Sequence, residues 1–76
     1  MSELDRIRWQ CRRGLLELDL ILGRFIEHEL AGLPAAELQI FKELLGEADT
    51  RLFAWVMGQE EAPARYNTII RRLQLQ

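Results

Sequence analysis

The chain has 76 residues and a formal net charge of −2, from 10 Lys and Arg side chains against 12 Asp and Glu. With 49% hydrophobic residues it is long enough for one small hydrophobic core, so we expect residues 1–76 to form a single domain. The near-neutral charge disfavours a nucleic-acid-binding protein, because binding phosphates requires a basic face. The longest apolar run, 52–57, is far too short to span a bilayer, which argues against membrane insertion.

Cysteine content and the first residues bear on the cellular compartment. Cys11 is the only cysteine, which excludes an intramolecular disulfide and is typical of a reducing compartment. The first residues are acidic and lead into no long apolar run, so neither a secretory signal nor an Arg-rich transit segment is indicated. We therefore expect a cytoplasmic protein. Cys11 is either a small core residue or a reactive thiol activated by Arg12 and Arg13, and the sequence favours the core residue.

Both prolines, and every glycine except Gly23, fall at or near the ends of segments with an apolar repeat of helical period, which predicts an all-helical chain. The first helix is expected over about 4–13, with Ser2 as its N-cap and Asp5 completing a capping box. Gly14 interrupts the repeat. A second helix is then expected over about 15–30.

Three shorter helices are expected in the second half of the chain. Pro34 suits the first turn of the third helix, whose apolar repeat closes at Gly46. Asp49 is placed to cap a fourth helix, which Gly58 follows, and Pro63 opens a fifth. The linkers are only a few residues long. The predicted fold class is therefore all-α, a compact antiparallel bundle of five helices.

The residue types that common catalytic and metal sites need are scarce. One His and one Cys are too few for a zinc site, and Ser2, Thr50 and Thr68 are the only aliphatic hydroxyl groups. There is no Gly-rich phosphate-binding loop, and a dinucleotide fingerprint would need a strand that the sequence lacks. General acid or base work by Glu17 or His28 is the remaining enzymatic alternative. We predict a protein that is not an enzyme, with no catalytic residues and no metal site.

The first helix leaves side chains that packing does not explain. At about 100° per residue, its buried stripe is expected to hold Leu4, Ile7 and Cys11. Trp9 then points roughly 170° away from that stripe, with Arg6 and Arg13 beside it at the same helical spacing. An aromatic ring between two guanidinium groups is typical of a binding hot spot. The alternative is that Trp9 packs beneath a neighbouring helix.

The junction between the first two helices holds further candidates. An interior glycine costs about 1 kcal/mol relative to Ala, so Gly14 indicates either a bend or a close approach by another molecule. Glu17 either favours the N-terminus of the second helix or contacts a partner. His28 lies on one flank of that helix, as a solvated residue or a contact. Asp19 falls at the edge of the apolar stripe, where an Arg side chain is a candidate partner, although periodicity does not decide this.

The residues around this junction resemble a family signature. Residues 6–19 resemble the signature of the SdhE-type succinate dehydrogenase assembly factors, and within them residues 13–17 read Arg-Gly-Leu-Leu-Glu and match its Arg-Gly-x-x-Glu hallmark. The likeness continues, in order and with matching spacing, in three further segments: 25–29, 41–45 and 49–57. Pro34 departs from the Ser or Thr that the family often has there, which changes only a helix cap. Without a transit segment, the chain resembles a bacterial member.

The resemblance implies a five-helix protein that binds the flavoprotein subunit of succinate dehydrogenase, with that of fumarate reductase as a further candidate. It implies that the protein promotes covalent attachment of FAD to a histidine of this subunit. FAD then belongs to the flavoprotein and is not bound stably by the factor. The implied partner-binding residues are Arg13, Gly14 and Glu17, with Arg6, Trp9 and His28 as weaker members of the same face.

Two other functions stay open. One is a small helical DNA-binding or regulatory module, because three short helices with a glycine turn resemble a helix-turn-helix. The net charge of −2 and the lack of a basic recognition helix count against it. The other is an FAD carrier, which would have to bind free FAD by itself. A salt-dependent DNA shift would support the first, and titration of flavin fluorescence would support the second.

Overall fold

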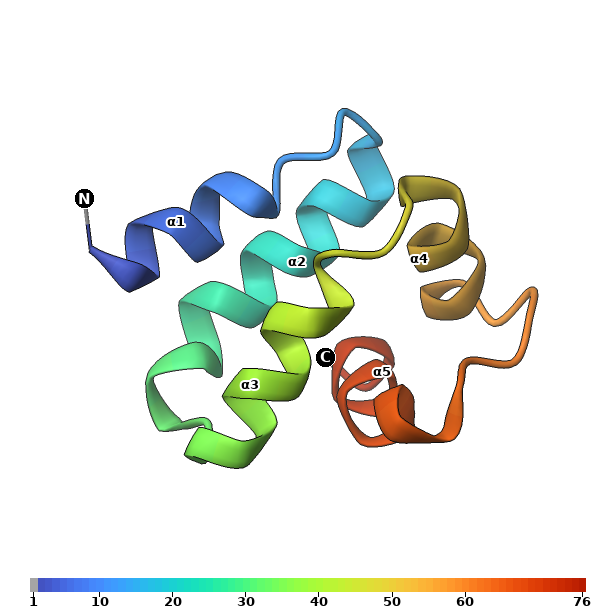
Figure 1. Cartoon of the computed structure of the whole chain (residues 1–76). Coiled ribbons are helices and arrows are strands. Elements are labelled where there is room, and N and C mark those ends of the chain that lie inside the picture. Colours follow the sequence, from blue (N-terminus) through green and yellow to red (C-terminus); the bar gives the residue numbers. More distant parts are fainter. Residues whose placement is uncertain (1) are drawn as a thin grey trace.

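A computed structural model of the chain describes residues 2–76 and contains five α-helices (Figure 1). In chain order they are α1 Glu3–Gln10, α2 Leu16–His28, α3 Ala35–Leu44, α4 Asp49–Val56 and α5 Asn67–Gln74. Short 3₁₀ turns at Leu30–Gly32 and Ala64–Tyr66 precede α3 and α5. No strand occurs among residues 2–76, so the predicted all-α class is confirmed. Within the same residues, no helix is long and apolar enough to cross a membrane.

The sequence predicts the start of α1 correctly but not its end. Ser2 Oγ accepts a 3.1 Å hydrogen bond from the N–H of Asp5, and the Asp5 carboxylate accepts one of 3.4 Å from the N–H of Ser2, which completes the predicted capping box. The helix ends at Gln10, so the expectation that it reaches Arg13 is wrong. It cannot continue because Gly14 has a φ of +79° and the Arg13 N–H bonds to a carboxylate.

Other helix ends also differ from the sequence pattern. After α2 the chain turns through the 3₁₀ turn, which buries Leu30. Asp49 does not cap α4 but is its first residue, and its carboxylate binds the side chain of Arg13. Pro34 stands just before α3 rather than in its first turn, and Pro63 precedes the second 3₁₀ turn rather than opening α5 directly.

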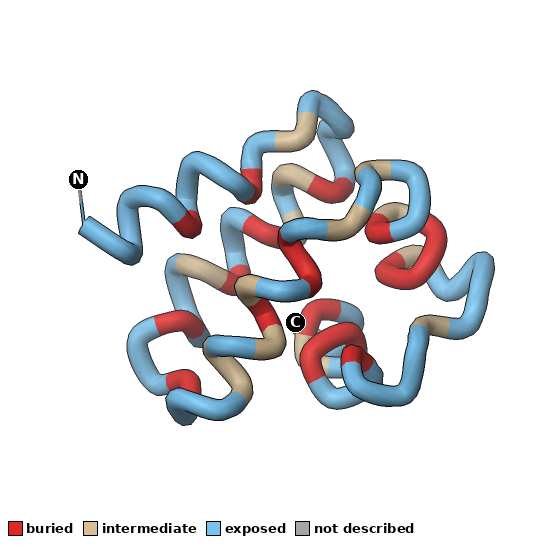
Figure 2. The backbone as a smooth tube through the Cα atoms, in the orientation of Figure 1, coloured by how far each residue is buried: buried red, intermediate tan, exposed pale blue. Residues whose placement is uncertain are grey.

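The hydrophobic core draws side chains from all five helices, as the buried segments in Figure 2 show. Two aromatic pairs lie within it. The Phe25 and Phe41 ring centroids are 5.0 Å apart, and those of Trp55 and Tyr66 are 5.7 Å apart, distances at which aromatic rings attract one another. Trp55 is buried, which confirms the expectation that it packs on another helix rather than facing water.

The helices differ in how far the fold encloses them. Helix α5 packs against α2, α3 and α4, whereas α1 lies at the edge with Ile7 as its only buried residue. Figure 1 shows α1, α2 and α3 running in alternating directions. Lys42 Nζ of α3 lies 2.6 Å from a Glu3 oxygen of α1, but exposed ion pairs stabilise a fold by only about 1 kcal/mol or less. Every residue of α1 except Ile7 is exposed.

Candidate partner-binding site

Asp19 holds the linker between α1 and α2 in one conformation. Its carboxylate accepts a 2.9 Å hydrogen bond from the N–H of Arg13 and a 3.1 Å bond from the N–H of Gly14. Gly14 is exposed and has a φ of +79°, in the left-handed region that side chains disfavour. A Cβ at Gly14 would meet no atom within 4 Å. The backbone conformation, and not crowding inside the chain, is therefore what favours glycine here.

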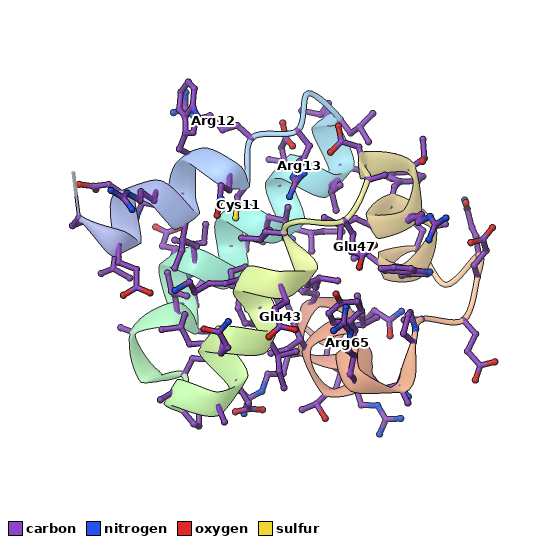
Figure 3. The ribbon with its side chains drawn as sticks, viewed as in Figure 1. Cys11, Arg12, Arg13, Glu43, Glu47 and Arg65 are labelled. Carbon is purple, nitrogen blue, oxygen red and sulfur yellow. The ribbon has the colours of Figure 1, made fainter. Side chains whose placement is uncertain are left out.

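Arg13 anchors this linker to a distant part of the chain. Its guanidinium donates a 3.0 Å hydrogen bond to Asp49 Oδ1 and another to the Leu45 carbonyl, so it spans from the α1–α2 linker to the α3–α4 linker (Figure 3). The side chain is only 14% exposed, and its Nε is buried without a partner among residues 2–76. A hydrogen bond to a charged group contributes about 1.5–3 kcal/mol. Arg13 thus fixes the linker against the body of the fold.

This placement corrects the expected stripe of Arg6, Trp9 and Arg13 on one helix face. Arg6 and Trp9 lie on α1, but Arg13 lies beyond its end and points toward the start of α4. Arg13 would lie beside Trp9 only if the helix continued to Arg13, and α1 ends at Gln10. Trp9 itself is 69% exposed and Arg6 is exposed too. The alternative in which Trp9 packs beneath a neighbouring helix is therefore wrong.

Glu17 and His28 lie at opposite ends of α2. Glu17 is in the first turn, close in sequence to Gly14, and His28 is the last helical residue. Both side chains are exposed, and neither makes an ion pair or a side-chain hydrogen bond within residues 2–76. At about 1.5 Å per residue, the two positions are roughly 16 Å apart along the axis. Gly14 and Glu17 thus share one end of α2, and His28 belongs to the other.

Three residues of this region, Asp19, Leu16 and Leu20, are not among the expected partner-binding residues. Asp19 binds backbone N–H groups of the linker rather than the Arg side chain considered for it. Leu16 and Leu20 are 75% and 53% exposed, an unusual exposure for leucines in a helix. A helical wheel of α2 carries the signal, because both leucines lie opposite the buried stripe that contains Leu18 and Leu22.

The thiol of this region is buried and unreactive. Cys11 is buried, which confirms its interpretation as a core residue. Burial raises the pKa of the Cys11 thiol to about 12, against a smaller lowering by the Arg13 charge, so the thiol stays protonated and unreactive near neutral pH. Within residues 2–76, no cluster of three or more His, Cys, Asp or Glu side chains is placed to hold a metal ion.

Comparison with known proteins identifies the family. Residues 5–76 match the family described as flavinator of succinate dehydrogenase. The chain belongs to this family. The FAD assembly factor SdhE of Legionella pneumophila (strain Lens) is 49% identical over 59 residues, which cover 78% of this chain and 75% of the relative. The FAD assembly factor SdhE of Coxiella burnetii is 41% identical over 70 residues, covering 91% and 85%.

A third relative, the FAD assembly factor SdhE of Photobacterium profundum, is 47% identical over 65 residues, covering 83% of this chain and 74% of its own length. These flavinator-family matches confirm the resemblance that begins at the Arg-Gly-x-x-Glu signature of residues 13–17. No solved structure matches the chain.

Proposed function

We propose that this protein binds the flavoprotein subunit of succinate dehydrogenase and promotes the covalent attachment of FAD to it. Membership of the flavinator family and the names of its relatives as FAD assembly factors support the proposal. The structural observation that supports it most is the clamped linker, in which Asp19 and Arg13 fix the exposed Gly14. A contact that is fixed before the partner arrives loses little conformational entropy on binding.

The proposed contact surface centres on the end of α2 that carries the linker. Gly14 allows the partner's backbone to approach closely, and the unpaired Glu17 carboxylate accepts hydrogen bonds from it. Arg6 and Trp9 extend the surface along α1. Arg13 acts by anchoring the linker, and its direct contact with the flavoprotein stays a prediction.

His28 is a separate, more distant contact. It follows Glu17 by about three turns of α2, so a partner must cover the length of that helix to reach both. A His28→Ala change should therefore weaken binding less than a change at Glu17. Standard interfaces bury about 800 Å² on each partner, an area large enough to include both ends of the helix.

The proposed mechanism is a shift in the flavoprotein's conformational population. The flavoprotein supplies the histidine and holds the FAD, and this protein supplies binding energy. A helper that binds the attachment-competent conformer tenfold more tightly than other conformers raises its relative population tenfold, which takes about 1.4 kcal/mol of differential affinity. The same argument extends to the flavoprotein subunit of fumarate reductase as a second client. A cytoplasmic location stays a prediction.

Co-expression tests the proposal. The flavoprotein subunit is produced with and without this protein in cells that lack their own factor, and covalent flavin is read as fluorescence on a denaturing gel. Glu17→Ala should remove most of the gain while changing stability by no more than about 1 kcal/mol. Glu61→Ala, an exposed acid in the loop after α4, is the matched control and should keep the gain. Equal fluorescence with and without the wild-type protein would refute the proposed function.

Titration with free FAD separates the proposal from the carrier alternative. The purified protein should bind FAD weakly or not at all, because FAD belongs to the flavoprotein in this mechanism. A tight stoichiometric complex with FAD would instead support a carrier. A salt-sensitive gel shift with duplex DNA would revive the DNA-binding alternative.

A further inference from the structure

A groove of about 790 Å³ runs between the C-terminal end of α1 and the outer side of α2. Arg8 and Arg12 line it from the α1 side, and Gly23, Ile26 and Glu27 line it from α2. Cys11 closes it at the end of α1, where Figure 3 shows this side chain beside α2. The groove thus begins at the clamped linker and extends along α2 beyond the Arg-Gly-x-x-Glu signature.

Gly23 at the groove has no explanation inside the chain. It lies in the middle of α2, where glycine is among the least favourable residues. Its φ is not positive, since Gly14 and Gly58 are the positive-φ glycines of residues 2–76. A Cβ at Gly23 would meet no atom within 4 Å. Neither backbone conformation nor packing in the free protein requires glycine, and the open space above Gly23 admits close approach by another molecule.

Two exposed leucines precede Gly23 on the same side of α2, outside the lining of the groove. One stripe along the helix is formed by four residues at i, i+4, i+7 and i+11, namely Leu16, Leu20, Gly23 and Glu27. All four are exposed, and Leu16 and Leu20 are 75% and 53% exposed. An apolar stripe of this kind, next to a gap left by a missing side chain, suits an apolar side chain of a partner.

The free charges of the groove favour an acidic partner. Arg8 and Arg12 make no ion pair within residues 2–76. Asp19 and Glu27 balance the formal charge of the lining, but the Asp19 oxygens are occupied by two backbone N–H groups, so the donors of both guanidinium groups stay unpaired within the described part of the chain. Arg forms bidentate hydrogen bonds with carboxylates, so an Asp or Glu of the partner is the natural complement.

We propose that this groove receives an extended segment of the flavoprotein, with an apolar side chain over Gly23 beside Leu20 and an acidic side chain paired with Arg8 or Arg12. The proposal rests on the proposed function and adds a second contact region to the clamped linker. The client segment should therefore carry an apolar and an acidic side chain close together in sequence.

Two substitutions at Gly23 test the groove without unfolding the protein. Ala and Leu are both better helix formers than Gly, so Gly23→Ala and Gly23→Leu should raise the melting temperature, by roughly 4–8 °C. Gly23→Leu fills the groove and should weaken binding to the purified flavoprotein by at least about tenfold, the scale of one lost central contact. Gly23→Ala adds one methyl group and should weaken it less. Thr68→Leu, on the exposed side of α5, adds a similar side chain far from the groove and is the control.

The outcomes separate this inference from the proposed function. If the wild-type protein neither binds the flavoprotein nor raises its covalent flavin, the proposed function fails. If the wild type does both and Gly23→Leu binds equally well, the groove is not a contact and the inference alone is overturned. A wild-type dimer that Gly23→Leu converts to a monomer would also overturn it, because a second copy would then fill the groove. Wild-type binding should weaken with added salt, and Arg12→Gln should reduce that dependence.

Discussion

Replacing Gly14 by Ala separates two roles of this position, which are the backbone conformation that folding needs and the proposed contact with the flavoprotein. Its φ of +79° puts a non-glycine residue in the left-handed region, at a cost of about 1–2 kcal/mol. The open space around Gly14 adds no steric cost within the chain. A domain of 76 residues has an expected stability of about 4–11 kcal/mol, so Gly14→Ala should stay folded at 25 °C. Its melting temperature should fall by about 4–8 °C for each kcal/mol.

Gly58 offers a matched control for this experiment. It follows α4 with a φ of +75°, and a Cβ there would also meet no atom within 4 Å. Gly58→Ala should therefore lose a similar amount of stability by the same mechanism. We expect only Gly14→Ala to lose promotion of covalent flavin attachment, measured by gel fluorescence at a temperature where circular dichroism shows both variants folded. If both variants lose activity in proportion to their unfolded fraction, Gly14 serves folding alone and the reasoning is refuted.

Three more experiments probe residues of the same region. Arg13→Met removes the bonds to Asp49 and the Leu45 carbonyl, so urea unfolding should show a loss of about 1–3 kcal/mol, and a loss near zero would show that the anchor is unimportant. Cys11, with its pKa raised to about 12 by burial, should react with a thiol reagent at pH 8 only as fast as the protein unfolds, and rapid labelling would contradict its burial. In Trp55→Phe, where Trp9 is the only tryptophan, emission should be red-shifted and quenched by iodide in the free protein and become protected in the flavoprotein complex. Blue-shifted, unquenchable emission from the free protein would show that Trp9 is buried.

The sequence predicts those features whose partners lie close together along the chain. The Ser2 and Asp5 capping box falls within one helical turn, and the five helices follow from apolar repeats of helical period. The Arg-Gly-x-x-Glu segment is also local, which is why the amino-acid sequence alone is enough to recognise the family. The exposure of Trp9 agrees with its angle to the Ile7 and Cys11 side of α1, but Leu4, expected on the same buried stripe, is 46% exposed.

Contacts between distant residues leave no such pattern. Arg13 and Asp49 are 36 residues apart, and nothing near either residue indicates the other. A charged residue ahead of a helix is a common cap, so the pattern assigns Asp49 to α4 and misses its bond to Arg13. The end of α1 is misplaced for a related reason. Helical periodicity continues through Arg13, whereas the backbone N–H groups of the linker are captured by Asp19, a competition that periodicity does not describe.

The bond between Arg13 and Asp49 makes the proposed contact surface depend on a contact between residues 36 apart in sequence. The Asp19 bonds that shape the linker between α1 and α2 are local in sequence, whereas the Arg13 side chain finds its partners only when Leu45 and Asp49 are docked beside it. A chain with its helices formed but these two segments undocked would lack the Arg13 anchor. On the proposed function, a flavoprotein would meet the complete contact surface only on a chain in which Arg13 is anchored.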